Sequence, residues 1–418
     1  MKVLVLAPHP LFVPRGTPIA VRAVLEGLSA QGHRVDVLSF HEGEDITDLA
    51  GVAHHRIDRP WGVDRVPIGV SWQKLVSDVW LYGRAKRMIR DAAAAGEPYD
   101  VIHAGEEAVF LAAWFGRRFG MPFVYDMDSR MSAQLVEKSP WLTPASWVFE
   151  WLEKKSIAAS AGVLAVCPAL VDEAKPMHPA GNVALLPDIP NTGTADGELP
   201  PALVEAPGPP EGVRFMYVGN LEPYQGVDLM LDAFKLAARE SGEAELIVVG
   251  GTESKIEHYS TKARDLVTVG RVRFVGPVPI DRLGRVMEHA DVLVSPRIKG
   301  DNTPMKVYSY LQSGKPVLAT RLLTHTQVMD DRVSVLVEPT AEAMGKAMVE
   351  LAESAQRRAE VGAAGRAYVE REFSRDAYRE RLRRFYDGLE HEIKPKTGTA
   401  KGAAELKGGG PPLKRETA

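Results

Sequence analysis

The feature that most constrains the fold is a regular alternation of short apolar runs with longer amphipathic stretches, which occurs twice along the chain. The apolar runs of the first half are VLVLA, VDVLSF, DVIHA, PFVYD and GVLAV. Those of the second half are RFMYVG, AELIVVGG, VRFVG, DVLVSP and KPVLAT. Strands and helices that alternate at this spacing form parallel sheets with crossover helices. The chain is therefore predicted to be α/β, with two doubly wound, Rossmann-like parallel-sheet domains facing a central cleft.

A stretch rich in proline and glycine separates the two series of strands and sets the predicted domain boundaries. The first domain is predicted over residues 1–190, a linker over 191–212 and the second domain over 213–372. A helical stretch at 373–391 could pack on either domain, judged by its pattern alone. Residues 392–418, rich in glycine, proline and lysine, are predicted to form a disordered tail.

Composition excludes several classes of protein. The 418 residues carry a net charge of -4, so no global field attracts nucleic acid. A single cysteine rules out an intramolecular disulfide and fits a cytoplasmic location. No run approaches the roughly 18 apolar residues that span a bilayer. The absence of a G-K-[ST] P-loop and of a G-x-G-x-x-G motif after a strand argues against a kinase, an ATPase and a nicotinamide dehydrogenase.

Two loops at strand ends are predicted to bind an anion. Thr17 and Pro18 are predicted as the N-cap and first residue of a helix, and Gly16 lets the backbone approach a ligand closely. A helix that starts just after a strand offers its N–H groups to an anion. Gly219 lies at a strand end of the second domain and is predicted to face the same cleft. The alternative for the first loop is a helix start without a ligand.

Lys306 lies where a cation is unfavourable. Thr303 and Pro304 are predicted as the N-cap and first residue of a helix that stops at Gly314, which places Lys306 in the first turn. The helix dipole opposes a positive charge there. A bound anion, with Arg297 also close in sequence, would offset the repulsion, and phosphate is the obvious anion. The alternative is a Lys306 side chain that extends into solvent.

Four segments, taken in order, resemble the retaining glycosyltransferases of family 4, which have the GT-B fold. The segments are PRGTPIAVRAVLEGLSAQGHRVDVLS, YDMDS, YVGNLEPYQGVDLMLDAF and MKVYSYLQSGKPVLAT, and the resemblance extends from residue 1 to about 391. It implies a nucleotide-sugar donor on the second domain and a sugar or lipid-linked acceptor on the first. It also implies transfer with retention, in glycan, polysaccharide or glycolipid synthesis, without a metal or other cofactor. The last helix is implied to pack back on the first domain.

The chain departs from this family at charged positions. The two glutamates of the donor motif correspond to Asp301, which could keep the acidic role at the sugar, and to Ser309. The arginine and lysine that contact the diphosphate correspond to Asn220 and Gln225, and an acceptor-side histidine corresponds to Asp128.

The predicted site follows from these departures. Asp128 and Asp301 are the catalytic candidates. Arg297 and Lys306 are predicted to take over phosphate binding. The full set of predicted donor-binding residues is Gly16, Thr17, Gly219, Asn220, Gln225, Arg297, Asn302, Thr303, Lys306 and Ser309. Asp128 could alternatively cap a helix that starts after Ser129.

Two other functions stay open from the sequence, a sugar-nucleotide epimerase of similar architecture and a non-catalytic sugar-binding relative. Peripheral contact with an anionic membrane is also open. The stretch from Trp72 combines aromatic residues with basic ones; these are Trp72, Trp80, Tyr82, Lys74, Arg84, Lys86, Arg87 and Arg90. An ordinary crossover helix with a solvated basic face is the alternative. Trp141, Trp147 and Trp151 could add to such a surface, although the prediction favoured here is that they are core residues.

Overall fold

The computed structural model describes residues 1–11, 16–67, 71–132, 143–144, 146–191, 193, 197–204, 212–240 and 244–397, with only the backbone for 394–397. The strands are β1 Lys2–Leu6, β2 Arg34–Ser39, β3 Val52–Arg56, β4 Val101–Gly105, β5 Phe123–Met127, β6 Gly162–Ala165, β7 Val183–Leu185, β8 Arg214–Val218, β9 Glu245–Val249, β10 Val272–Gly276, β11 Val292–Ser295, β12 Val317–Thr320 and β13 Val335–Val337.

The longer helices are α1 Gly16–Ala30, α2 Trp72–Ala94, α3 Ala108–Phe119, α5 Ser146–Ala159, α8 Val227–Glu240, α9 Glu253–Lys262, α14 Ala341–Glu353, α15 Ala355–Glu372 and α16 Arg375–Thr397. The shorter helical segments are α6 Pro168–Ala174, η2 Lys175–Met177, α7 Pro201–Val204, η3 Pro223–Gln225, α10 Arg264–Thr268, η4 Ile280–Arg282, α11 Leu283–Glu288, α12 Lys306–Gln312 and α13 Leu323–Thr326.

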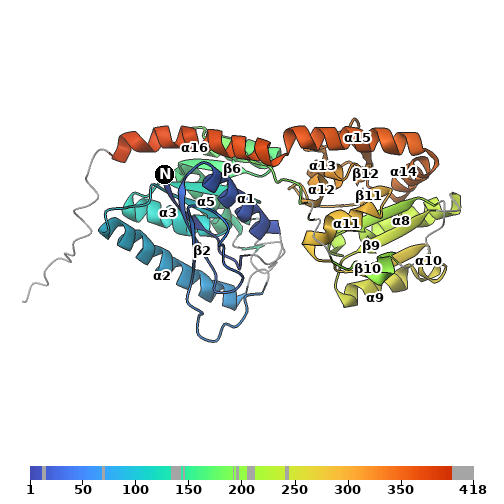
Figure 1. The fold of residues 1–418 in the computed structure, drawn as a ribbon, viewed down its shortest axis with the longest axis horizontal. Coiled ribbons are helices and arrows are strands. Elements are labelled where there is room, and N and C mark those ends of the chain that lie inside the picture. The colour runs from blue at the N-terminus through green and yellow to red at the C-terminus, as the bar shows by residue number, and fades with distance from the viewer. Residues whose placement is uncertain are drawn as a thin grey trace, which may run out of the picture.

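Each half of the chain forms one parallel sheet. The first has the strand order β3-β2-β1-β4-β5-β6-β7 and the second β10-β9-β8-β11-β12-β13. All the paired strands run parallel. In both sheets the strand order reverses beside the first strand, which is where ligands bind in doubly wound folds. The predicted architecture of two doubly wound parallel sheets is confirmed (Figure 1).

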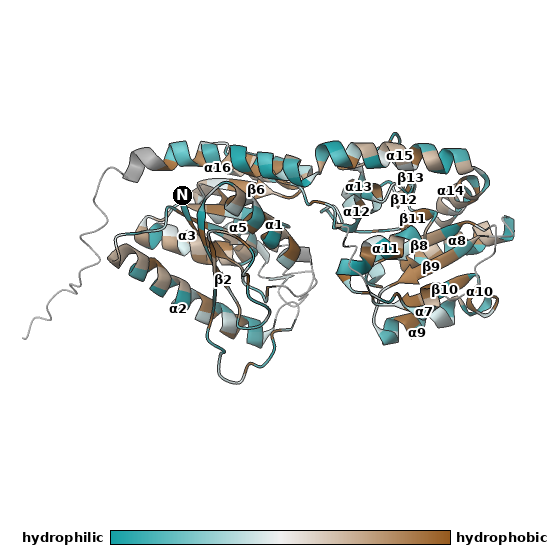
Figure 2. Cartoon of the chain, in the orientation of Figure 1, coloured by the Kyte–Doolittle hydropathy of each residue, from teal (hydrophilic) through white to brown (hydrophobic). Residues whose placement is uncertain are grey.

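Apolar side chains fill both faces of each sheet, as expected for parallel strands. On the first sheet, α2, α3, α5 and α6 cover one face, and α1 with α16 covers the other. On the second sheet, α8 and α14 cover one face, and α11 and α12 cover the other. Figure 2 shows the contrast between the largely apolar β9 and β10 and the mostly hydrophilic α16.

The last helix links the two halves of the molecule. α15 lies on the second domain, and α16 continues along the first, where it packs against α1 (Figure 1). Gly27 permits this contact, because a Cβ atom there would lie 2.5 Å from Cδ2 of the buried Leu382. The predicted start of the tail at residue 392 is wrong, because α16 continues to Thr397. Residues 398–418 lie outside the described residues.

Part of the predicted linker packs on the second domain. Arg285 Nη1 donates to the Gly197 carbonyl at 2.6 Å, and Arg273 Nη1 donates to the Ala202 carbonyl at 2.8 Å. Leu203 is buried in the same layer as α11 and α12. The described linker residues after 193 therefore follow the second domain.

Aromatic side chains are exposed over the helices of the first domain. Trp147 and Trp151 in α5 are 68% and 51% exposed, so the prediction that they belong to the core is wrong. Trp72 and Trp80 in α2 are also exposed, at 58% and 41%. Trp141 lies outside the described residues. The error has a simple cause: α5 buries its opposite face, around Ile157, so these rings face solvent.

Lys74 differs from the rest of the predicted basic face of α2. Its ammonium pairs with Glu107, lies 3.8 Å from Glu106 and donates to the Pro8 carbonyl at 2.8 Å. Burial lowers the pKa of Lys74, but the neighbouring carboxylates outweigh it and raise that pKa overall. Lys74 therefore fastens α2 to the interior and does not form part of a basic surface.

Candidate functional site

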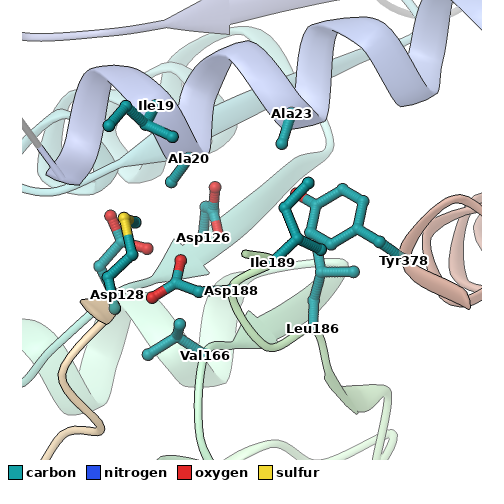
Figure 3. Close-up of a pocket in the computed structure, with 11 residues that line it drawn as sticks. Ile19, Ala20, Ala23, Asp126, Asp128, Val166, Leu186, Asp188, Ile189 and Tyr378 are labelled. Carbon is teal, nitrogen blue, oxygen red and sulfur yellow. The ribbon is translucent and has the colours of Figure 1, made fainter. Parts of the chain in front are cut away.

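A pocket lies at the carboxyl ends of β5, β6 and β7, where a ligand site is expected in a doubly wound sheet (Figure 3). Helix α1 forms one wall, α16 supplies Tyr378, and the loop before α12 of the second domain supplies Met305. The lining residues are Ile19, Ala20, Ala23, Asp126, Asp128, Val166, Leu186, Asp188, Ile189, Met305 and Tyr378. The pocket therefore draws on both halves of the chain.

Three carboxylates gather in this pocket. Asp126 Oδ2 lies 3.0 Å from His103 Nε2, and His103 Nδ1 lies 2.8 Å from the hydroxyl of Tyr386. Asp128 and Asp188 have no hydrogen-bond partner among the described residues. Burial, and after it the charge of Asp126, raises the pKa of Asp128 well above its usual range and that of Asp188 to about 7. Both shifts favour the protonated forms of the two acids that have no basic partner among the described residues.

Glu153 of α5 holds the segment that follows Asp128. Its carboxylate accepts hydrogen bonds from Met131 N at 2.9 Å, Ser132 N at 3.2 Å, Ser132 Oγ at 2.7 Å and the Tyr125 hydroxyl at 3.0 Å. The alternative in which Asp128 caps these residues is therefore wrong, because Glu153 already takes their N–H groups. Asp128 is left to face the pocket.

Lys306 lies half-buried in the second domain. Its ammonium lies 3.2 Å from Gln225 Oε1 and 4.0 Å from the centre of the Tyr217 ring. A Cβ atom on Gly219 would lie 3.2 Å from the same ammonium. Burial, together with the charge of Arg297, lowers the pKa of Lys306 to about 7. No carboxylate pairs with this lysine among the described residues.

The predicted helix start near Lys306 is wrong. Thr303 and Pro304 precede α12, which begins at Lys306 with Met305 at the N-cap position and without a side-chain cap. Thr303 itself is buried. The helix dipole therefore supports a bound anion at Lys306 less strongly than the partial burial of its ammonium does.

Arg297 braces the loop that carries Asp301. Its guanidinium donates to the Lys299 carbonyl at 2.7 Å, to the Asn302 carbonyl at 3.4 Å and to Asn302 Oδ1 at 3.3 Å. It also lies over the Tyr224 ring, 5.2 Å from its centre. The Asp301 side chain is exposed, and its backbone carbonyl accepts from Gln327 Nε2, at the end of α13, at 3.0 Å. Arg297 thus has two effects. It holds this loop through hydrogen bonds, and its positive charge also acts on Lys306.

Two predicted donor residues make contacts with the backbone. Ser309 Oγ accepts from Asn191 N at 2.9 Å and donates to Asn191 O at 3.0 Å, which ties α12 to the linker. The Asn220 carbonyl accepts from the Tyr217 hydroxyl at 2.5 Å, and the residue is exposed. Gln225, Gly219 and Lys306 are therefore close together, whereas Ser309 faces the linker.

The loop of the first domain that was predicted to bind an anion contacts a carboxylate, that of Glu106. α1 begins at Gly16, so Thr17 lies inside the helix and is not its N-cap, which corrects the prediction. Thr17 Oγ1 donates to Glu106 Oε1 at 3.1 Å. Glu106 has φ of 47°, a left-handed conformation that is uncommon for a residue other than glycine.

Sequence reasoning missed Asp126, Asp188, Glu153 and Tyr378. Asp126 and Asp188 could have been found from their places at or just after strand ends. The contacts of Glu153 and Tyr378 carry no local signal, because they join helices to loops far away in the chain.

Within the described residues, no group of three or more His, Cys, Asp or Glu side chains is arranged to hold a metal ion. Over the same residues, no helix is long and apolar enough to cross a membrane.

Comparison with known families matches most of the chain. Residues 15–188 match the family described as "Glycosyl transferase 4-like domain". Residues 212–354 match the family described as "Glycosyl transferases group 1". The two matches coincide with the two parallel sheets.

Curated relatives are distant. The phosphatidyl-myo-inositol mannosyltransferase of Mycobacterium leprae is 25% identical over 79% of this chain and 81% of its own length. The D-inositol 3-phosphate glycosyltransferase of Corynebacterium diphtheriae is 27% identical over 32% of this chain and 37% of its own length. The chain thus spans most of the first relative but well under half of the second.

Solved structures share the fold. Sucrose-phosphate synthase of Thermosynechococcus elongatus superposes with a TM-score of 0.70 at 19% identity, over 94% of this chain and 99% of that one. HepE of Anabaena in complex with UDP superposes with a TM-score of 0.67 at 15% identity, over 93% of this chain and 100% of that one. At these identities the likeness concerns the fold alone.

Proposed function

The chain belongs to the family 4 glycosyltransferases with the GT-B fold, and from this premise we propose that it transfers a sugar, with retention, from a nucleotide-sugar donor to a sugar or lipid-linked acceptor. The prediction of a glycosyltransferase in glycan synthesis is confirmed by the family matches, in preference to an epimerase. The donor, the stereochemistry and the acceptor class are the proposed part. A UDP-bound relative of the same fold supports the choice of a nucleotide sugar.

The observation that carries the donor proposal is the half-buried ammonium of Lys306, which has no carboxylate partner among the described residues. A cation that is partly removed from water without a counter-ion is unfavourable, and an anionic ligand offsets that cost. Its described neighbours are an amide oxygen of Gln225 and the face of Tyr217, and the charge of Arg297 adds to the repulsion. A diphosphate placed against Lys306 and the loop at Gly219 would supply the missing negative charge.

Lys306→Ala is expected to weaken donor binding by about 2–3 kcal/mol, roughly 30- to 150-fold in Kd, because one charge-assisted partner is removed. Calorimetric titration with a panel of nucleotide sugars measures this loss for the donor that binds best. Lys346→Ala, which truncates an exposed lysine of α14, is the matched control and should bind like the parent protein.

The same titration has a pH signature. The pKa of Lys306 in the empty protein is lowered to about 7, and a bound anion favours the charged form and raises this pKa. Binding should therefore take up protons, and affinity should fall as the pH rises above about 7. Unchanged affinity in Lys306→Ala, or affinity that is flat with pH, would place the diphosphate elsewhere.

On the acceptor side, we propose that Asp128 contacts the attacking hydroxyl of the acceptor. Asp128 lines the pocket, and Glu153, not Asp128, accepts from the N–H of Met131. Asp301 is proposed to lie at the transferred sugar, supported by its exposed position in the loop that Arg297 braces. Turnover of Asp301→Asn with the best donor tests that residue, and full activity would remove it from the site.

Peripheral contact with the cytoplasmic face of an anionic membrane is also proposed. The exposed residues of α2 lie along one side of the helix, mostly apolar in its first half, with two arginines and one aspartate toward its end. These residues are Trp72, Leu75, Val79, Trp80, Gly83, Arg87, Arg90, Asp91 and Ala94. The neighbouring helices α3 and α5 add exposed Trp114, Trp147 and Trp151 on the same side of the sheet.

A further inference from the structure

The acidic pocket of the first domain has a chemistry that the proposed reaction does not by itself require. Asp126, Asp128 and Asp188 converge beneath α1, and none of the described lining residues is basic (Figure 3). Among the described residues, His103 is the basic partner of this cluster, through Asp126. Asp128 and Asp188 pair with no cation among those residues, so ion pairs within the protein do not explain their presence.

A second observation also points to a ligand. Tyr378 of α16 is only 6% exposed, lines the pocket and directs its ring toward the aspartates (Figure 3). Its hydroxyl has no hydrogen-bond partner among the described residues. A hydroxyl that makes no protein hydrogen bond, on a side chain as buried as that of Tyr378, is available to a bound ligand. The pocket therefore offers one hydroxyl and three carboxylates to whatever enters.

We propose that this pocket, formed by Asp126, Asp128, Asp188 and Tyr378, receives a protonated amino group of the acceptor, so that the acceptor is an amino sugar. The inference rests on the proposed function in taking the occupant to be the acceptor. An ammonium carries three N–H donors and one positive charge, which match carboxylates and a hydroxyl oxygen. A phosphate group would meet repulsion from every charged lining residue.

Neutral hydroxyls fit less well than an ammonium. Burial raises the pKa values of Asp128 and Asp188 and so favours their protonated forms in the empty protein. A polyol leaves these protons in place, whereas a cation favours the ionised acids and expels protons. The groups that set this balance are Asp126 with its partner His103, Asp128, Asp188 and, at the edge, Glu106.

Calorimetry without donor tests the proposal, so that the outcome does not depend on catalysis. The probes are D-glucosamine, N-acetyl-D-glucosamine and D-glucose 6-phosphate at pH 6.5, where the free amine is protonated. Glucosamine should bind at least about tenfold more tightly than the N-acetyl sugar. In buffers of different ionisation enthalpy, its binding should release protons.

Two conservative variants and a control complete the design. Asp188→Asn keeps the shape but removes the charge, and Tyr378→Phe removes only the hydroxyl; each should reduce the preference for glucosamine by at least about threefold. Asp58→Asn, at an exposed aspartate of the same domain, should leave it unchanged.

Equal binding of glucosamine and its N-acetyl form, no binding of glucosamine, or tighter binding of glucose 6-phosphate would each overturn the proposal. A protein that binds glucosamine in this way but transfers sugar from no donor would overturn the proposed function and the acceptor role, and would leave the amine-binding site itself standing. Sugar transfer to acceptors without any preference for an amine would leave the proposed function standing and would overturn this inference.

Discussion

At the scale of single residues, Glu153 determines which contacts the Asp128 carboxylate can make. Buried carboxylates persist when their lone pairs are satisfied, and Glu153 accepts four hydrogen bonds from three residues around the end of β5. Because these bonds occupy the N–H groups that follow Asp128, the Asp128 carboxylate remains available to the pocket. Glu153 is thus a positioning residue that acts through the loop.

Glu153→Gln should lower stability by about 1–3 kcal/mol, because whichever way the amide is turned its NH2 faces a backbone N–H donor. The loosened Asp128 loop should also reduce turnover by roughly tenfold or more. Asp128→Asn, which changes the pocket itself, should reduce turnover by a similar factor with stability kept. Urea denaturation and initial rates on the same samples measure both effects.

Glu150→Gln on the same helix is the control, because its carboxylate has no hydrogen bond among the described residues. A Glu153→Gln protein that loses stability but keeps its full rate would show that the loop position is irrelevant to catalysis.

Helix α2 shows how one element serves the interior and the surface at once. Leu81, Ala85 and Met88 face the core, and Lys74 anchors the first turn through Glu107. The opposite side exposes mostly apolar residues first and two arginines with one aspartate later, an arrangement that suits the interface of an anionic bilayer.

Replacing Arg87 and Arg90 with glutamate should abolish co-sedimentation with vesicles of phosphatidylcholine and phosphatidylglycerol, because each basic residue near an anionic surface contributes about 1 kcal/mol. The parent protein should bind these vesicles and not vesicles of phosphatidylcholine alone. Lys346→Glu with Arg357→Glu, on exposed positions of α14 and α15, makes the same charge change away from α2. An equal loss of vesicle binding in both double variants would show that binding depends on net charge and not on the position of α2.

The whole molecule is two sheets joined by a linker and by α16, with few direct contacts between them. Ser309 bonds the Asn191 backbone, Gln327 Oε1 accepts from Ala169 N at 3.3 Å, and Met305 reaches the acidic pocket. Since Lys306 lies in one domain and Asp128 in the other, sugar transfer would bring the domains together around the substrates.

Saturating donor should therefore reduce the radius of gyration measured by small-angle scattering, because closure excludes water that would otherwise hydrolyse the donor. Lys306→Ala at the same donor concentration should not compact. An unchanged radius with donor bound would contradict closure and favour a cleft that is already closed.

Local patterns predicted the strands, their parallel pairing and the division into two series. Apolar runs such as VLVLA and DVLVSP are buried on both faces only in a parallel sheet, so their composition already implies the architecture. Lys306 was also singled out locally as an anion-binding candidate, by a cation placed near a helix start, although that helix begins later than predicted.

The sequence by itself determined the fold class and the loops at the strand ends, because these depend on neighbours within a few residues. Only the tertiary structure decided the chemistry of the acidic pocket. His103 and Tyr386 are separated by 283 positions, and Tyr378 meets Asp188 only because α16 crosses back onto α1. The contact of Ser309 with the linker likewise depends on tertiary structure, since its partner Asn191 is 118 positions away. No local pattern carries such contacts, because the strand order and the helix crossing exist only once the whole chain has packed.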